Sequence, residues 1–389
     1  MNQKILSTIT HKSKKTVALI LVILFLTGIS YLAASYLTTH PLTPEGTHSS
    51  RKTGPENIGN DWWEAGLLIY HGIPARIVFL LPPAAGNSPE AVNKAVWLEF
   101  ERIGEIFNPF DPNSEIFYLN STSQSDPILI SDDVNSVIRI SQQLWIDTNR
   151  QFDPTMWQIK QLWQNAEKNQ QIPGIKDIAT ALQWTGFDKV RLDEKAENSI
   201  KFENHPVKFD FGGIIKGYAV DQTRQILLNS GVTAGLVQLG GEISAFGNND
   251  EKPWRIGIQH PKQMDKVWGV ISSYNSLRVS TSGNYRQPIQ INGHSFYHIF
   301  SPETGKPVSE KILGVTTVSL GGKETNARLD GIATAITVMG AAKGLALAEK
   351  LNIDVLILYE KKDGSIGEIM TDGLSTSYNH TQMGSSAKQ

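Results

Sequence analysis

The chain has 389 residues, of which 40% are hydrophobic and 19% charged, which is the composition of a globular protein with one large domain or two smaller ones. Its formal net charge of −2 gives no reason to expect a nucleic-acid-binding protein. Cysteine is absent, which excludes disulfides, thiolate catalysis, cysteine zinc sites and a lipid-modified N-terminal cysteine.

An apolar, uncharged run at residues 16–37 predicts a helix long enough to span a membrane. Lysines precede this run, and no lysine or arginine follows it until Arg51. The positive-inside rule therefore places residues 1–15 in the cytoplasm and the rest of the chain outside it. A cleaved signal peptide is the alternative, with Ala33 and Ala34 as candidate cleavage residues. The length of the run favours an uncleaved anchor.

The remainder divides into three parts by composition. Residues 38–60 are rich in Thr, Pro, Ser, His and Gly and predict a linker. Residues 61–370 carry the hydrophobic patterns of a folded domain. Residues 371–389 form a polar tail whose composition is compatible with disorder.

Helical and strand patterns are mixed along the folded part. Helices are predicted at residues 88–107, 133–148, 157–167, 175–184 and 327–351, the first with Ser88 as its cap and Pro89 in its first turn. Strands are predicted at residues 67–81 with a break at 72–74, at 189–202 as a hairpin, and at 207–211, 234–239, 254–259, 269–273, 277–282, 314–320 and 355–359. Because strands and helices do not alternate regularly, the mixture predicts an α+β fold with mixed or antiparallel sheets and packed helices.

Residues 207–231 predict a strand, a glycine turn and a helix in succession. Hydrophobic and polar residues alternate over 207–211, and Gly212 and Gly213 permit a tight turn. Lys216 therefore falls in the first helical turn, where free amide donors, the positive helix end and an ammonium group suit an anion such as phosphate. The alternative is an ordinary strand-to-helix connection with a solvated lysine, and the spacing of a Walker motif is absent.

Asp330 and Thr334 lie four residues apart in a predicted helix, so they share one face. An acidic residue in an apolar helix is costly to bury unless it is paired or bound to a metal, and aspartate with a hydroxyl suits a hard cation such as Mg²⁺. The alternative is that Asp330 caps its helix while Thr334 bonds a backbone carbonyl.

Two further segments contain residues that suit catalysis or ligand binding. His298 is a candidate general base near neutral pH, with a hydrogen-bonded histidine on a strand edge as the alternative. At residues 282–286, Gly283 permits close approach of a ligand, and Tyr285 or Arg286 suits an aromatic or phosphate group. A plain β-turn is the alternative there.

Taken together, seven blocks in order resemble the bacterial FAD:protein FMN transferases, also called the ApbE family. The blocks are FDPNSEIFYLN at 110–120, FDPT at 152–155 with Leu162 and Trp163, DFGGIIKGYAVD at 210–221, GGEI at 240–243, STSGNYR at 280–286, YHIFSPETGKPV at 297–308 and DGIAT at 330–334. The resemblance extends roughly over residues 65–370.

The resemblance implies an ApbE-like (T-fold-like) α+β domain with a deep FAD cleft. It implies a Mg²⁺-dependent transferase that cleaves FAD, attaches FMN through a phosphoester to Thr or Ser of an acceptor protein and releases AMP. The alternatives are a Mg²⁺-dependent FAD pyrophosphatase, which gives FMN and AMP, and a non-catalytic flavin-binding protein. The implied acceptors are proteins with FMN-binding domains, such as subunits of sodium-pumping NADH:quinone reductases or related electron-transport complexes.

The resemblance also implies roles for individual residues. The metal ligands would be the side chains of Asp330 and Thr334 and the backbone carbonyl of Gly213. His298 would be the base that activates the acceptor hydroxyl, and Asp330 would share the catalytic role through the metal. The residues implied to bind FAD are Lys216, Gly240, Gly241, Glu242, Ser282, Gly283, Tyr285 and His298.

The chain departs from the family pattern at several positions. Ser301 and Asn284 stand where aspartate is expected, and Glu242 replaces a frequent aspartate. The segment 71–73 reads His-Gly-Ile in place of Met-Gly-Thr. Many relatives are lipoproteins, and a transmembrane anchor would serve the same purpose here. The expected location is therefore the bacterial cytoplasmic membrane, with a single pass and the catalytic domain on the periplasmic side.

Overall fold

The structure, a computed structural model, describes residues 54–70, 72–122, 126–192, 198–203, 207–283, 288–308 and 311–381. The predicted membrane segment at 16–37 lies outside these residues. Among the helices of the described ranges, none is both long and apolar enough to cross a membrane.

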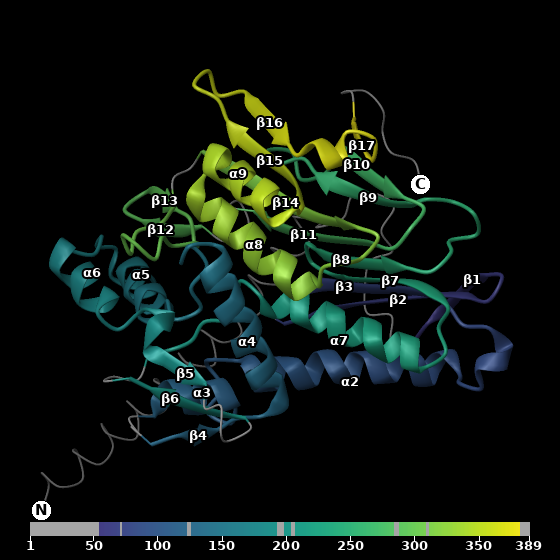
Figure 1. Cartoon of the computed structure of the whole chain (residues 1–389), viewed down its shortest axis with the longest axis horizontal. Coiled ribbons are helices and arrows are strands. Elements are labelled where there is room, and N and C mark those ends of the chain that lie inside the picture. The colour runs from purple at the N-terminus through teal and green to yellow at the C-terminus, as the bar shows by residue number, and fades with distance from the viewer. Residues whose placement is uncertain are drawn as a thin grey trace, which may run out of the picture. The chain divides into compact units, whose positions relative to one another are not determined.

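A central antiparallel sheet organises the domain (Figure 1). Its strand order is β1-β2-β3-β7-β8-β11-β14-β15-β16, and neighbouring strands pair antiparallel throughout. The strands are β1 (Glu56–Gly59), β2 (Trp62–Ile69), β3 (Ile73–Leu80), β7 (Ala234–Leu239), β8 (Glu242–Phe246), β11 (Leu277–Gly283), β14 (Ile312–Leu320), β15 (Asp354–Glu360) and β16 (Ile366–Met370). The α+β prediction with antiparallel strands is confirmed.

Three smaller sheets accompany it. A second antiparallel sheet contains β9 (Trp254–Gln259), β10 (Val267–Ser273) and β17 (Tyr378–His380). The others are the hairpin of β12 (Ile289–Ile291) and β13 (His294–Phe296), and the sheet of β4 (Ile128–Leu129), β5 (Val190–Leu192) and β6 (Ser199–Phe202).

Most helices begin and end close to the predicted positions, but the helix predicted at 327–351 is divided at Gly340, which has a φ of 81°, and α3 was not predicted. They are α2 (Pro89–Phe107), α3 (Glu115–Ser121), α4 (Asp132–Asp147), α5 (Trp157–Asn169), α6 (Ile175–Leu182), α7 (Ile215–Asn229), α8 (Asn326–Met339) and α9 (Ala341–Leu351), with short 3₁₀ turns at Pro83–Ala85, Phe187–Lys189 and Asp372–Leu374. At the start of α2, the Ser88 hydroxyl accepts a hydrogen bond from the Ala91 amide and Pro89 occupies the first turn, as predicted.

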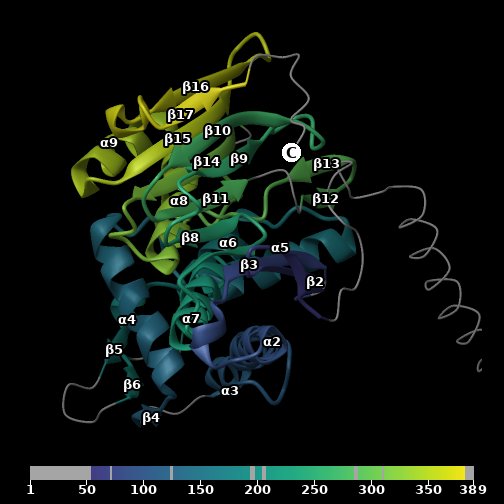
Figure 2. The ribbon, with the colours of Figure 1, turned by 90° about the vertical axis from the view of Figure 1, so that its right-hand side faces the viewer.

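Both faces of the central sheet are buried, which explains why its strands are so apolar. On β3, Ile77 and Phe79 pack with the helices α2, α4, α7 and α8. The alternate residues Val78 and Leu80 pack toward the second sheet. Figure 2 shows α7 and α2 below β3 in that view. Since successive strand residues point to opposite faces, the inner strands such as β14 and β15 carry hydrophobic residues on both faces, whereas the edge strand β1 is exposed.

The strand predicted at 207–211 does not form. Burial alternates as expected, with Phe209 inside, but the backbone there makes only the isolated bridge between Lys208 and Met156. The side chain of Asn120 takes the place of a neighbouring strand: its Nδ2 donates to the Phe209 carbonyl at 2.9 Å, and its Oδ1 accepts from the Phe209 amide at 2.6 Å. The alternating pattern thus predicted which side chains are buried, but it did not predict which group forms hydrogen bonds with the backbone.

Regular structure also extends into both segments predicted to lie outside the domain. Strand β1 falls within the predicted linker, where it pairs with β2. Strand β17 falls within the predicted tail, where it pairs with β10. Strand β16 was missed because its sequence, IGEIM, is short and contains glycine and glutamate.

Helices α7 and α8 cross closely at Gly217. A Cβ atom at this position would lie 2.7 Å from the Ala327 Cα and would also overlap the Asn326 carbonyl. Backbone atoms cannot yield as a flexible side chain can, so the crossing requires glycine.

We expect Gly217→Ala to lower the free energy of unfolding by about 1–3 kcal/mol, because the added methyl group must separate the two helices. Denaturant unfolding measures this change. Gly66→Ala is the control, since its Cβ would meet its nearest neighbour, the Ala75 carbonyl oxygen, at 3.6 Å. Equal stability of the two variants would contradict the proposed close crossing.

Candidate active site

Three charged side chains from different elements meet between the central sheet and its helices. Lys216 lies in the first turn of α7, Glu242 begins β8, and Asp330 lies in the second turn of α8. The Lys216 ammonium is 3.1 and 3.0 Å from the two carboxylate oxygens of Asp330 and 3.2 Å from Glu242 Oε1. The side chain of Lys216 is 26% exposed, whereas those of Glu242 and Asp330 are 0% and 1% exposed. Lys216 is thus the least buried side chain of the cluster.

Asp330 also binds the N-terminus of α7. The Gly217 amide donates to Asp330 Oδ2 at 3.2 Å, and the residue at the α7 cap position, Ile214, has no side chain that could accept a bond. An acidic group there is stabilised by the helix dipole. Asp330 is therefore paired both with an ammonium group and with a helix amide. Capping occurs too, but on a neighbouring helix, since Thr325 caps α8 itself.

The Glu242 carboxyl group lies in an environment that disfavours its ionised form. Burial raises its pKa to about 8, and the negative charge of Asp330 acts in the same direction. The Lys216 charge and the Ser280 hydroxyl, which donates to Glu242 Oε2, oppose this rise. Burial lowers the pKa of Lys216, but the two carboxylates outweigh it and the net pKa is raised. Lys216 therefore remains an ammonium group.

Thr334 extends the site by one turn of α8. Its hydroxyl is 3.4 Å from the hydroxyl of Ser282 on β11. A Cβ atom at Gly213 would lie 3.0 Å from Thr334 Oγ1, so a side chain there would crowd that hydroxyl. Together with Asp330, these residues offer carboxylate, hydroxyl and carbonyl oxygens, which is the donor chemistry of a hard cation.

The two buried carboxylates and one ammonium group leave one negative charge when all three are ionised. A divalent cation beside Asp330 would offset that charge, so the residues present fit such an ion. Across the described ranges, no group of three or more His, Asp or Glu side chains is arranged to hold a metal. A cation here would therefore depend on the hydroxyl and carbonyl oxygens as well.

The predicted glycines lie next to this cluster. Gly240 and Gly241 form the turn between β7 and β8, immediately before Glu242. Gly240 has a φ of 60°, and a Cβ on Gly241 would lie 2.8 Å from the Thr281 carbonyl oxygen. Gly283 ends β11. The turn thus brings bare backbone close to β11, as the sequence predicts. Tyr285, Asn284 and His71 lie outside the described residues.

His298 is positioned by another part of the fold. It follows β13 and is partly buried. The Val308 amide donates to the Ile299 carbonyl at 2.9 Å, and Trp163 Nε1 of α5 donates to the Gly305 carbonyl at 2.9 Å. The segment that carries His298, which follows the β12–β13 hairpin, is therefore anchored on α5, whereas the charged cluster is held by α7, α8 and β8.

Sequence reasoning assigned no role to Ser280 or Asp221. Ser280 is fully buried and pairs with Glu242 across β8 and β11. Asp221 of α7 accepts hydrogen bonds from the first two amides of α8, those of Asn326 and Ala327. The argument that singled out Asp330, an acidic residue in an apolar helix, could have found Asp221, which directly follows Ala219 and Val220.

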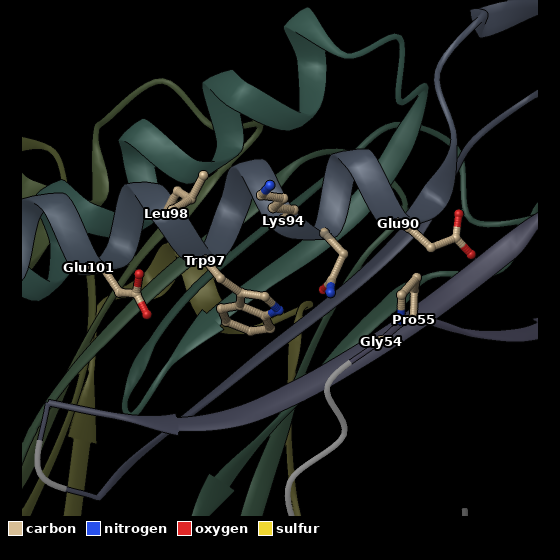
Figure 3. Close-up of a pocket in the computed structure, with 8 residues that line it drawn as sticks. Gly54, Pro55, Glu90, Lys94, Trp97, Leu98 and Glu101 are labelled. Atoms are coloured by element: carbon tan, nitrogen blue, oxygen red, sulfur yellow. The ribbon is translucent and has the colours of Figure 1, made fainter.

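A groove elsewhere shares no residue with this cluster. It has a volume of about 350 Å³ and lies between α2 and the segment before β1. Figure 3 shows Trp97 pointing from α2 toward the strands, with Gly54 and Pro55 on the opposite side. Its remaining lining residues are Glu90, Asn93, Lys94, Leu98 and Glu101. Concavity alone therefore does not mark the charged site.

Comparison with known proteins agrees with the resemblance. The family model described as "ApbE family" matches residues 71–357. The chain belongs to the ApbE family. Among its relatives, the FAD:protein FMN transferase of Haemophilus influenzae is 30% identical over 301 residues, which cover 76% of this chain and 86% of the relative. The one from Vibrio cholerae is 27% identical over 318 residues, covering 77% and 93%.

Solved ApbE structures share the fold. The ApbE protein from Thermotoga maritima superposes with a TM-score of 0.71 and 27% identity, covering 81% of this chain and 99% of that one. The flavin transferase ApbE from Vibrio cholerae gives a TM-score of 0.68 at 23% identity, covering 80% and 98%. The ApbE-like fold expected from the sequence is thus confirmed.

We expect Lys216→Met to destabilise the protein by up to about 3–5 kcal/mol, because it leaves two buried carboxylates without their cation. Lys160→Met is the matched control. Lys160 is 29% exposed, similar to Lys216, and pairs with Asp210 at 2.8 Å, but that carboxylate is 21% exposed. Its loss should change the free energy of unfolding by about 0–1 kcal/mol. Similar decreases in the free energy of unfolding of the two variants, measured in urea, would show that the cluster is not a buried charge site.

The raised pKa of Glu242 predicts a pH dependence of stability in the metal-free protein. Between its ordinary value of 4.5 and about 8, the folded state binds more protons at Glu242 than the unfolded state does. Stability should therefore fall as pH rises through this range, and Glu242→Gln should reduce that fall. Urea unfolding at about pH 5 and about pH 8 gives the comparison. Identical pH dependence in the two proteins would contradict the raised pKa.

Proposed function

We propose that this chain is a Mg²⁺-dependent FAD:protein FMN transferase that joins FMN to a Thr or Ser of an acceptor protein and releases AMP. The observation that carries the proposal is the cluster of Lys216, Glu242 and Asp330, with Thr334 and Gly213 beside it, in a chain of the ApbE family. The curated relatives named above are FAD:protein FMN transferases, and this chain covers most of their length.

The residues present suit the pyrophosphate of FAD. Lys216 supplies a partly exposed positive charge at the start of α7, where a helix terminus favours anions. The bare turn at Gly240 and Gly241 permits close approach of a nucleotide to the backbone. In this proposal the nucleotide also contacts Ser282 and Gly283 at the end of β11, and Tyr285, which follows them in the sequence.

Asp330, Thr334 and the Gly213 carbonyl would hold Mg²⁺. When bound, the ion supplies positive charge that neutralises the pyrophosphate during phosphoryl transfer. The protein's own contribution is positional. Asp330 is fixed by Lys216 and the Gly217 amide, and Gly213 leaves the Thr334 hydroxyl uncrowded.

The transfer itself needs a base for the acceptor. The acceptor hydroxyl oxygen bonds to the phosphorus of the FMN half of FAD, the bond from that phosphorus to the bridging oxygen breaks, and AMP leaves with the bridging oxygen. In our proposal His298 takes the hydroxyl proton, as a histidine can near neutral pH.

We further propose that the acceptors are FMN-binding domains of electron-transfer proteins, such as subunits of sodium-pumping NADH:quinone reductases. The apolar run at 16–37, preceded by lysines, supports attachment to the cytoplasmic membrane with the catalytic domain on the periplasmic side. Such acceptors would then lie at the same membrane surface.

The test combines the full chain, FAD, Mg²⁺ and a candidate acceptor domain. We expect the acceptor to gain the mass of one FMN while AMP is released. Asp330→Asn should lower both by at least about 100-fold, since loss of a direct metal ligand should exceed the typical 10- to 100-fold effect of its outer partners. Asp363→Ala, in the exposed loop between β15 and β16, should match the unaltered chain.

The outcomes separate the three candidate functions. AMP release that does not require the acceptor, with no labelled acceptor, would favour the FAD pyrophosphatase. Bound FAD without any AMP would favour a flavin-binding protein. Activity that is unchanged in Asp330→Asn would contradict the metal site, and unchanged turnover in His298→Ala would contradict the proposed base.

A further inference from the structure

We infer that Asp221 is a positioning residue for Asp330: it fixes the first turn of α8 and thereby the place of the Asp330 carboxylate. The inference rests on the proposed function for its effect on Mg²⁺, whereas the positioning itself is a property of the fold. Asp221 does not belong to the charged cluster and acts through the backbone of α8.

The contacts of Asp221 are made to the main chain of α8. Its Oδ1 accepts from the Asn326 amide at 3.1 Å, and its Oδ2 accepts from the Ala327 amide at 2.9 Å. These amides are the first two of the helix and have no acceptor within it. Thr325 Oγ1 accepts the third, from Arg328. Asp221 therefore fixes the position and direction of α8 at its start.

Asp221 is itself held in place. Arg278 Nη1 of β11 lies 2.9 Å from Asp221 Oδ1, and the two side chains are 11% and 15% exposed. Since β11 also carries Ser280 and Ser282, this ion pair ties Asp221 of α7, and through its hydrogen bonds the start of α8, to the strand that contributes to the site. A largely buried, charge-assisted bond of this kind is stronger than a surface ion pair.

Asp221 and Asp330 are connected through a single turn of α8. Asp330 follows Asn326 by about one helical turn, so a movement of the first turn carries its carboxylate along. That carboxylate in turn binds the Gly217 amide of α7. Each helix thus bonds the other's first turn, and loss of one link should loosen the other.

A second ion pair on α8 serves as a matched control. Arg328 Nη1 lies 2.8 Å from Asp147 Oδ2, with the two side chains 22% and 18% exposed. This pair joins α8 to α4 through side chains alone and uses no α8 amide. Asp147→Asn therefore removes an aspartate of similar exposure that also contacts α8, without freeing the N-terminus of α8.

The experiment compares Asp221→Asn, Asp147→Asn and Arg278→Met in the full chain. Hydrogen exchange, read by mass spectrometry on fragments covering the first turns of α7 and α8, reports the two helix termini. Mg²⁺ binding is measured by calorimetry without FAD. We expect Asp221→Asn to speed exchange in both first turns and to weaken Mg²⁺ binding by about 10-fold. Arg278→Met should act in the same direction but less, and Asp147→Asn should do neither.

Asp330→Ala calibrates the α7 signal, because it removes the acceptor of the Gly217 amide directly. Unchanged exchange at the α7 first turn in Asp221→Asn would overturn the inference. So would equal effects of Asp221→Asn and Asp147→Asn, which would indicate general loosening. If the unaltered chain binds no Mg²⁺ but Asp221→Asn still loosens the α7 turn, the positioning role stands and the proposed metal chemistry fails.

Discussion

The arrangement of the site depends on two helices, each of which supplies a carboxylate that accepts hydrogen bonds from the first turn of the other. Asp330 of α8 accepts from the amide of Gly217 at the start of α7, and Asp221 of α7 accepts from the first two amides of α8. Each bond satisfies donors that a helix end leaves free, and each places an acidic group at the positive end of a helix dipole. These reciprocal hydrogen bonds are possible because Gly217 lets the two helices approach closely. A side chain at the crossing would separate both acceptors from their donors.

These reciprocal hydrogen bonds explain how Asp330 can be buried beside Glu242. Burying either carboxylate alone would be unfavourable, and the pKa of Glu242 near 8 shows that the compensation is incomplete. Lys216 and the α7 amide compensate Asp330, whereas Glu242 has the same ammonium group and the hydroxyl of Ser280. The remaining unfavourable energy is local to the cluster. A ligand that brings positive charge would relieve it, so the same feature that weakens the metal-free fold would strengthen cation binding.

The sequence predicts well those features that depend on neighbours along the chain. The start of α2 needs only Ser88 and Pro89, and both act as predicted. The strand at 207–211 was wrong because its backbone is bonded by Asn120, which is 89 residues away. The ion pair between Lys216 and Asp330 joins residues 114 apart. Periodicity predicts which side of a segment is buried, but it carries no information on which distant polar group will satisfy it. The family resemblance named Lys216, Glu242 and Asp330 as site residues, but it did not predict that they pair with one another, and it assigned no role to Asp221 or Ser280.

The charged cluster and His298 are supported by different parts of the fold. The charged cluster rests on the central sheet and on the paired helices, so its geometry is determined by the main core. His298 lies in the segment after β13, next to a separate small hydrophobic cluster that includes Trp163 of α5 and Phe300. If the proposed function holds, the cluster assigned to the substrate charge and the histidine assigned to the acceptor hydroxyl are therefore supported by separate hydrophobic clusters that share no helix.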